Sequence, residues 1–280
     1  MHFVKLSNNS NVCYLNTIIQ FLISIPCFRK MIRGDTNGKT LLLSFFRIYL
    51  THTKKSSNVI LNSEVLLEEL SQEWPEYGMG NQMDAHELLI RLLEYFEVKM
   101  NMKPKIDSLF NIQFTSTVKC QCGYISTTHF SERYIVMDYS SSIQHVLETK
   151  QDILEDWKCE RCQQVGTTIK ILKTNNPLPP VLFVQIERFD MCGGKIDEAL
   201  KAVDIKLKYS YMSRVKEYIL RGVVVHIGQG IDCGHYVVLI WNDINWILID
   251  DFIIKQLGEK EALHLIKHNA YILVYSSSLC

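Results

Sequence analysis

Residues 7–22 read SNNSNVCYLNTIIQFL, a polar stretch that leads through one cysteine into an apolar run. The apolar side chains recur at the spacing of one helix face, at Leu15, Ile18, Ile19, Leu22 and Ile25, and Pro26 stops the run. This pattern predicts a helix that begins near Cys13. A thiol at a helix N-terminus lies at the positive end of the helix dipole, which favours the thiolate. Cys13 is therefore either a buried thiol in a polar turn or a nucleophile, and this stretch alone favours the buried thiol.

The composition is that of an ordinary globular chain. The sequence has 280 residues, of which 47% are hydrophobic and 21% charged, enough for one large domain or two modest ones. Lysine plus arginine equals aspartate plus glutamate, 30 each, so no strong field favours nucleic acid or an anionic membrane. We therefore expect neither as a partner.

The start MHFVKLSNNS has no apolar signal segment, and no run of about 18 apolar residues follows it. We expect an intracellular protein of the cytoplasm, the nucleus or both. In that setting the nine cysteines suggest metal binding where they are paired, and core packing or catalysis where they are alone.

The pattern changes from helix to strand along the chain. Residues 13–100 read mainly as helix: Asn62 or Ser63 is placed to cap the run EVLLEELSQEW, and another helix begins near Asn81. Strand-like runs start near residue 108, with a short helix at 141–148. The runs VLFVQIERF, YILRGVVVHI, HYVVLIW, WILIDD and AYILVY predict one central sheet. Helices first and sheet last give an α+β fold.

Four central cysteines form two pairs, Cys120-x-Cys122 and Cys159-x-x-Cys162. Two thiolate pairs on two turns can close a tetrahedral zinc site, which would be structural because it leaves no open position. The alternatives are four small core residues or two unrelated turns. His129 and His145 lie between the pairs and offer a substitute ligand, although both fit surface positions.

A histidine and an aspartate stand at the ends of two neighbouring apolar runs in GHYVVLIWNDINWILIDDF. Antiparallel pairing of these runs brings His235 close to Asp250, where a carboxylate can orient an imidazole and stabilise its charged form. The alternative is a strand-end histidine beside two solvated acids, Asp250 and Asp251. His226, in VVVHIG, is the rival base.

Cys13, His235 and Asp250, in that order, resemble the catalytic residues of the ubiquitin-specific protease family of cysteine deubiquitinases. The resemblance extends over nearly the whole chain. LSNNSNVCYLNTIIQFL is similar to the family's cysteine box, NQMDAHELLIRLLE to its glutamine–aspartate helix, and LPPVLFVQIERF to a strand that follows. The two cysteine pairs resemble its fingers zinc site, VVVHIG…GHYVVLI…WILIDD its histidine box, and NAYILVY its closing strand.

The resemblance implies a papain-like hand in one catalytic domain, residues 1–280. The thumb would cover residues 1–107, the fingers with part of the palm 108–175, and the palm 176–280.

By position in the motifs, Cys13 attacks the carbonyl of ubiquitin's terminal glycine, forms an acyl-enzyme, and releases the product by hydrolysis. His235 would move the proton and Asp250 would orient His235. Asn8 would donate a hydrogen bond to the oxyanion, and Asp251 would support this oxyanion hole. The neighbouring Asn11 would cap the helix.

The same resemblance implies that Asp84 and Glu87 face the arginines of ubiquitin's tail. Gly234 would keep the channel narrow enough for two glycines, and Tyr236 would line it. The alternative for Asp84 and Glu87 alone is a helix start that favours acids. The expected cofactor is one structural zinc ion on Cys120, Cys122, Cys159 and Cys162. The expected partner is ubiquitin, a ubiquitin-like modifier or a ubiquitinated protein, bound by a monomer.

Several positions depart from the family pattern. Ser10 and Val12 replace a glycine and a threonine, Met83 replaces a glutamine, and Glu187 replaces a lysine. Cys120-x-Cys122 is one residue shorter than the usual knuckle. A second hypothesis is therefore a catalytically weak scaffold that binds ubiquitin or a related modifier. A third, a zinc-ribbon protein acting on nucleic acid, is disfavoured by the zero net charge.

Overall fold

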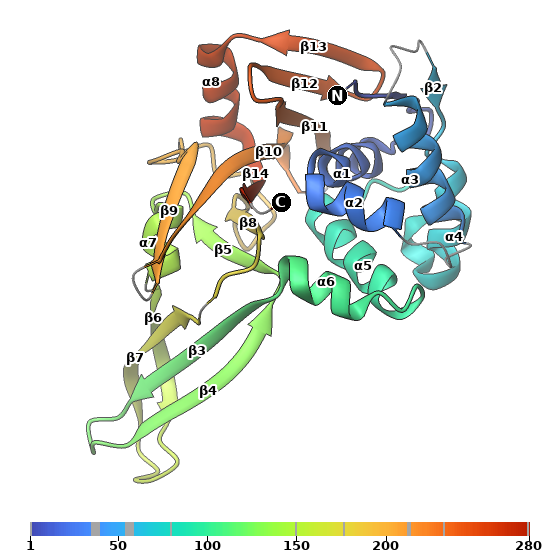
Figure 1. The fold of residues 1–280 in the computed structure, drawn as a ribbon. Coiled ribbons are helices and arrows are strands. Elements are labelled where there is room, and N and C mark those ends of the chain that lie inside the picture. The colour runs from blue at the N-terminus through green and yellow to red at the C-terminus, as the bar shows by residue number, and fades with distance from the viewer. Residues whose placement is uncertain are drawn as a thin grey trace.

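The N-terminal part of the chain is helical in the computed structural model, which describes residues 2–34, 40–53, 59–78, 80–148, 150–175, 177–211, 214–231, 233–278 and 280. The helices lie together to the right of Figure 1. They are α1 (Cys13–Ser24), α2 (Pro26–Gly34), α3 (Leu41–His52), α4 (Val65–Glu73), α5 (Ala85–Val98) and α6 (Lys103–Phe110), with a 3₁₀ turn at Pro75–Tyr77. A two-stranded parallel sheet joins β1 (Lys5–Leu6) to β2 (Ile60–Leu61).

The apolar runs of the C-terminal half form one mixed sheet, which confirms the predicted central sheet. Its order is β13-β12-β11-β10-β14-β8-β5, with β9 also paired to β10. Each pair is antiparallel except β5 with β8, which is parallel. The strands are β5 (Tyr134–Asp138), β8 (Val181–Glu187), β9 (Lys206–Tyr211), β10 (Arg214–Gly230), β11 (Cys233–Trp241), β12 (Trp246–Asp250), β13 (Ile253–Leu257) and β14 (Ala270–Ser277).

A second, four-stranded sheet projects from the rest of the molecule (Figure 1). Its order is β4-β3-β7-β6, made by β3 (Ile112–Lys119), β4 (Ile125–Glu132), β6 (Lys150–Lys158) and β7 (Val165–Thr174). Residues 129–139, HFSERYIVMDY, have the pattern of one strand but are divided between this sheet (β4) and the central sheet (β5). The chain is thus α+β, as predicted.

Helix α1 lies at the centre of the molecule, because its apolar side chains pack in the core and its buried polar side chains, such as Asn16, Gln20 and Ser24, have hydrogen-bond partners. Every residue from Cys13 to Ser24 is buried between the other helices and the central sheet. Phe21 packs on Phe183 of β8, with ring centroids 5.8 Å apart. A helix buried on all sides cannot shift or rotate without opening the core, so the sheet fixes the position of Cys13.

Two short helices cover the sheet. The predicted helix at 141–148 is present as α7 (Ile143–Glu148), whose apolar side chains join the core. The sequence analysis missed α8 (Glu259–Asn269), an amphipathic helix that buries Ala262 and Ile266. Within the described residues, no single helix has the length and apolar character to cross a membrane, although α1 and α2 together, bent by 90°, meet those criteria.

The helix caps differ in part from those predicted. Val12, not Asn11, occupies the N-cap of α1, and the Asn11 side chain donates instead to the Gly80 carbonyl at 3.3 Å. Glu64 stands at the N-cap of α4, while Ser63 bonds the Asn16 side chain. Tertiary partners thus take Asn11 and Ser63, whereas Asn62 Oδ1 accepts a local hydrogen bond of 2.9 Å from the Glu64 N–H at the start of α4.

Two cysteines that the sequence analysis left unassigned form a disulfide. Cys27, at the start of α2, is bonded to Cys280, with 4.9 Å between their Cα atoms. They are separated by 253 residues, so only the packing of the chain end against α2 brings them together.

Candidate active site

Cys13 is the first residue of α1, as the opening stretch predicts, and it is only 4% exposed. The loop before it is held by Asn8, whose Oδ1 accepts a hydrogen bond of 2.9 Å from the Val12 backbone N–H. The thiol is therefore both buried and placed at the helix N-terminus. Burial alone therefore does not decide whether Cys13 is a structural thiol or a nucleophile. The side chains around it do.

His235 lies between Cys13 and Asp250. Its Nε2 is 2.6 Å from Asp250 Oδ1, which confirms the predicted pairing across β11 and β12. A side-chain hydrogen bond with Cys13 and the bond to Asp250, together with the charges of both groups, raise the pKa of His235 to about 9, although burial opposes the rise. The imidazole is therefore held in its protonated form near neutral pH, beside a sulfur that can carry the opposite charge.

A buried carboxylate organises the asparagines of the cysteine loop. Asp251 is 8% exposed, and it accepts hydrogen bonds from Asn8 Nδ2 at 2.8 Å and from Asn16 Nδ2 at 2.7 Å. Asn16 also donates to the Ser7 carbonyl at 2.9 Å and bonds Ser63. An amide nitrogen has two protons, so Asn8 keeps one N–H for a substrate oxygen after the bond to Asp251.

His226, the rival base, is buried behind the site. It is fully buried, and its ring packs against Phe189 and Tyr236. Burial and the positive charges of Lys195 and His235 lower the pKa of His226 to about 4. His226 is therefore neutral near pH 7, whereas the Cys13 side chain raises the pKa of His235.

Gly234 precedes His235 in a conformation that suits glycine, with φ of 150°. A Cβ atom at Gly234 would lie 2.4 Å from His226 Nε2, so a side chain there would displace the imidazole or the turn. Gln82 Nε2 donates to the Gly234 carbonyl at 2.6 Å, and this bond joins the segment before α5 to β11.

The residues expected to contact substrate have internal partners. Asp84 is the N-cap of α5 and accepts from the Glu87 N–H at 2.8 Å. Its other oxygen accepts from the hydroxyls of Tyr271 at 2.8 Å and Tyr236 at 3.3 Å. Tyr236 is fully buried, so in this structure it supports Asp84. Glu87 is 44% exposed and pairs with Arg91 at 2.6 Å.

The four central cysteines converge at the end of the second sheet, which confirms that the two pairs belong to one site. Cys120 Sγ is 3.7 Å from Cys162 Sγ, and Cys122 Sγ is 3.8 Å from Cys159 Sγ. All four sulfurs lie within 4.8 Å of one another, an arrangement that can hold a metal ion. His129 lies elsewhere, bonded to Thr115 at 3.0 Å.

Burial raises the pKa of Cys159, but hydrogen bonds from the backbone N–H groups of Cys162 and Arg161 outweigh it and lower that pKa to about 7.

Sequence reasoning missed four residues of the site: Asn16, Gln82, Arg91 and Tyr271. All four fall inside quoted motifs, so their positions carried a signal. The spacing of Glu87 and Arg91 by four residues is that of a helical ion pair, whereas the bonds of Gln82 to Gly234 and of Arg91 to Glu76 depend on how the segments pack.

The arrangement is suited to nucleophilic acyl transfer. A thiol at a helix N-terminus adjoins an imidazole, the imidazole adjoins a carboxylate, and an amide donor stands beside them. The reactive atoms of His235, Asp250 and Asp251 all lie within 4.8 Å of one another.

Comparison with known proteins agrees with this chemistry. The chain is 26% identical over 313 aligned residues to ubiquitin carboxyl-terminal hydrolase 36 of Drosophila melanogaster, an alignment that covers 97% of this chain and 30% of the fly protein. It is 27% identical over 314 residues to ubiquitin carboxyl-terminal hydrolase 25 of Arabidopsis thaliana, with 98% of this chain and 47% of the plant protein covered. The chain thus spans less than half the length of these relatives.

A sequence model of the family described as ubiquitin carboxyl-terminal hydrolase matches residues 4–275. The match runs from β1 to β14 and includes both cysteine pairs and the elements that carry Cys13, His235 and Asp250. The resemblance seen in the motifs is therefore confirmed, and the chain belongs to the ubiquitin carboxyl-terminal hydrolase family, with its papain-like α+β fold.

Proposed function

We propose that this chain is a thiol-dependent deubiquitinase that cleaves peptide, isopeptide and thioester bonds at the C-terminal glycine of ubiquitin. One observation carries the proposal: His235 Nε2 lies 2.6 Å from Asp250 Oδ1, and the side chain of Cys13 acts on the same imidazole and raises its pKa. Such a contact has little value for a buried structural thiol, because it places a charged ring beside the sulfur. It is what a cysteine nucleophile requires.

In the proposed reaction, Cys13 attacks the glycine carbonyl as a thiolate, and its proton resides on His235. Asn8 donates to the oxyanion that forms, which the free N–H of its amide supports. His235 then gives its proton to the leaving amine, and the acyl-enzyme is hydrolysed by water. Asp250 holds the imidazole through Nε2, which leaves the other ring nitrogen for Cys13.

The proposed tail channel passes Gly234. Gly234 has no side chain, and the crowding by His226 explains why no larger residue fits. Asp84 and Glu87 would attract the tail arginines, and for that Glu87 would have to exchange or share its partner Arg91. Tyr236 would act indirectly, by orienting Asp84.

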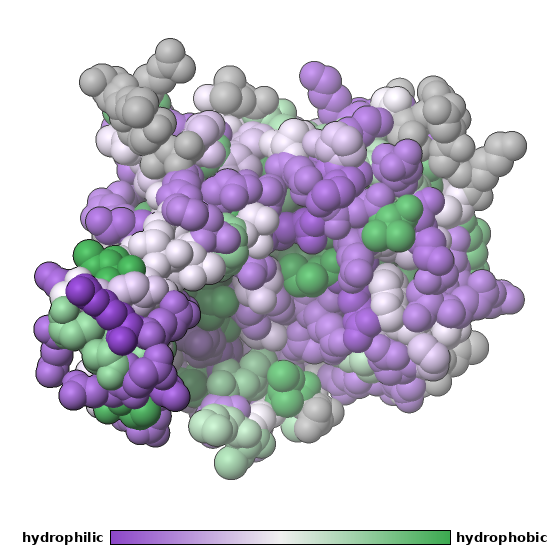
Figure 2. All heavy atoms as spheres, turned by 90° about the horizontal axis from the view of Figure 1, so that it is seen from below, coloured by the Kyte–Doolittle hydropathy of each residue, from purple (hydrophilic) through white to green (hydrophobic). Residues whose placement is uncertain are grey.

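The body of ubiquitin would lie outside this channel. Seen from below, a hollow with hydrophobic side chains on its floor separates the projecting second sheet from the rest of the molecule (Figure 2). A hollow of this kind suits a globular partner domain that is gripped on more than one side.

The metal of the cysteine site would be zinc. Four thiolates around zinc at about 2.3 Å have sulfurs about 3.8 Å apart, because the geometry is tetrahedral. The observed separations of 3.7 and 3.8 Å fit this value. The ion would tie the β3–β4 turn to the β6–β7 turn and would take no part in catalysis.

The proposal also includes a monomer in the cytoplasm or nucleus. Ubiquitin conjugation takes place in these compartments, which is the support for this part of the proposal. Fractionation of cells and light scattering of the purified protein test these two points.

The decisive experiment is turnover of ubiquitin carrying a C-terminal fluorogenic amide. Release of the fluorophore by the parent protein and loss of release in Cys13→Ala support the proposal. Tight ubiquitin binding without turnover would instead establish the scaffold.

A further inference from the structure

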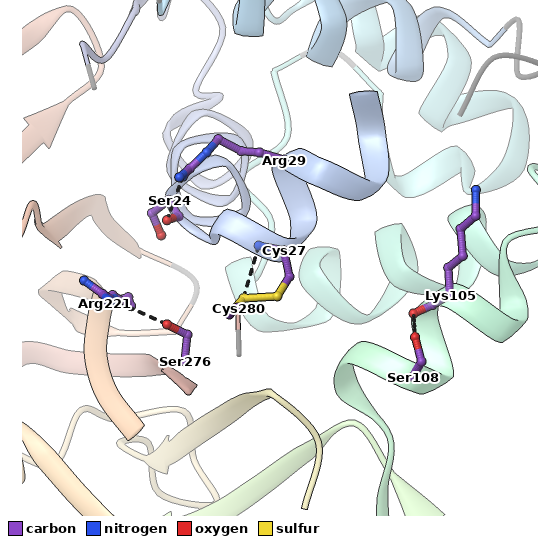
Figure 3. Close-up of a disulfide and its surroundings, with 8 residues drawn as sticks. All are labelled: Ser24, Cys27, Arg29, Lys105, Ser108, Arg221, Ser276 and Cys280. Carbon is purple, nitrogen blue, oxygen red and sulfur yellow. Dashed lines mark hydrogen bonds between the residues drawn. A yellow bond between two sulfur atoms is a disulfide. The ribbon is translucent and has the colours of Figure 1, made fainter. Parts of the chain in front are cut away.

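A cavity of about 520 Å³ lies between α2, α6 and β10. We call it the basic cavity and define it by Lys30, Met31, Lys105, Leu109, Pro180 and Lys216. The Cys27–Cys280 disulfide forms part of its wall, and Figure 3 shows this disulfide with Lys105 of α6 in its surroundings. Cavities of this size bind drug-sized ligands or a few residues of a peptide.

The lining of the basic cavity is positively charged. It contains three lysines, one each from α2, α6 and β10, and no acidic side chain among the described residues. The whole chain has 30 basic and 30 acidic residues, so this is a local excess and not a reflection of net charge.

The lysines have donor capacity left for a ligand. Lys216 Nζ donates to the Leu178 carbonyl at 2.7 Å and lies 5.2 Å from the centre of the Tyr218 ring. An ammonium group has three protons, so Lys216 can still bind an anion. Lys30 and Lys105 are exposed and reach the cavity from opposite sides, on α2 and α6.

The remaining wall is apolar. Met31, Leu109, Pro180 and the disulfide offer hydrocarbon and sulfur surface between the three charges. A bare phosphate ion would leave this surface uncovered. A nucleic acid would need cations in a row along its backbone, whereas these three surround one depression. The combination suits an anionic ligand that also has apolar side chains.

The basic cavity is far from the catalytic residues. Cys13 begins α1, whereas Cys27 follows the other end of that helix. Twelve helical residues span about 18 Å, so a ligand in the cavity leaves the tail channel open.

We propose that the basic cavity is a docking site for an acidic peptide segment of a protein partner, with carboxylates on the three lysines and an aliphatic or aromatic side chain on the apolar wall. Charge complementarity carries this assignment, because an acidic peptide pairs with each lysine and covers the surface between them. The site would select a partner without using the active site.

The test uses a fluorescein-labelled eight-residue peptide of alternating glutamate and leucine, with binding followed by fluorescence polarisation. The variant Lys30→Glu/Lys105→Glu reverses two charges at exposed positions outside the catalytic machinery. Lys201→Glu/Lys260→Glu makes the same change at exposed lysines elsewhere. We expect saturable binding that weakens at least tenfold in the first variant, and by less than twofold in the second. Raising the salt concentration should weaken binding as well.

Matched peptides complete the design. Replacing glutamate by lysine should abolish binding, and replacing leucine by serine should weaken it severalfold. Absence of saturable binding, equal loss in both variants, or stronger binding of duplex DNA, anionic vesicles or inorganic phosphate would overturn the proposal. Fluorogenic ubiquitin turnover, measured on the same samples, should be unchanged in both variants. That measurement reports on the proposed function separately, so either proposal can fail alone.

Discussion

Asp251 allows a direct test of how the cysteine loop is held. Its backbone has φ of 50°, a left-handed conformation that asparagine tolerates as well as aspartate does. Asp251→Asn therefore keeps the shape and the backbone, and changes only the charge and one acceptor atom. Asp243 has φ of 76° and a side chain that is 71% exposed, so Asp243→Asn is the matched control.

The magnitude follows from the two hydrogen bonds that Asp251 accepts, from Asn8 at 2.8 Å and from Asn16 at 2.7 Å. An asparagine side chain offers one acceptor oxygen, so one of these bonds is lost. The new NH₂ group then points at the NH₂ group of Asn8 or Asn16. A hydrogen bond to a charged group contributes about 1.5–3 kcal/mol. The free energy of unfolding should fall by about that amount.

The same loss should reduce catalysis, because Asn8 has fewer other partners than Asn16. Asn16 is also fixed by Ser7 and Ser63, whereas the Asn8 amide has one other bond, accepted by its oxygen from the Val12 N–H. We expect Asp251→Asn to lower kcat/KM about 10- to 100-fold, because a loss of about 1.5–3 kcal/mol is converted at about 1.4 kcal/mol per factor of ten in rate. Removing an oxyanion donor typically lowers kcat by a factor of about 10²–10³, and we expect a loss of this size for Asn8→Ala.

The assay is a double-mutant cycle with the fluorogenic ubiquitin amide, accompanied by thermal denaturation. If Asp251 acts through Asn8, the double variant Asn8→Ala/Asp251→Asn should be no slower than Asn8→Ala alone. The kcat/KM of Asp243→Asn should stay within twofold of that of the parent protein. Multiplication of the two single effects, or a loss of stability without any loss of kcat/KM, would refute the reasoning.

Three further predictions address the rest of the site. Cys13→Ala should abolish labelling by a ubiquitin probe with a C-terminal electrophile, whereas Cys233→Ala, at an exposed cysteine, should label fully. The pKa of His235 is raised from 6.5 to about 9, so its stabilising contribution is complete below about pH 6.5 and lost as the pH rises through 9. The basic limb of kcat/KM should therefore lie near pH 9, and Asp250→Asn should move it to lower pH; an unmoved limb would contradict this assignment. Elemental analysis should give about one zinc per chain, and near zero for Cys159→Ser; metal-free parent protein of full stability would exclude the zinc site.

The sequence predicted those features that arise from local pattern. The helix after Cys13 follows from apolar spacing and Pro26, and the central sheet follows from β-branched runs, since both depend on neighbours along the chain. The pairing of His235 with Asp250 was predictable because two adjacent strands joined by a short turn align their ends.

Features that depend on distant partners were not predictable from pattern. Asn11 and Ser63 are suitable caps by type, yet each bonds a group from another segment, because tertiary hydrogen bonds satisfy them better. The run at 129–139 is divided between two sheets, since its first part pairs with β3 and its second part with β8.

By itself, then, the sequence determined the fold class, the cysteine at a helix start, the paired cysteines and the motifs of the family. Only the tertiary structure decided that Arg91 also pairs with Glu76, that Gln82 bonds the Gly234 carbonyl, and that three lysines surround one cavity. The physical reason is separation along the chain. Gln82 and Gly234 are 152 residues apart, and their contact exists only after two independently formed elements pack together.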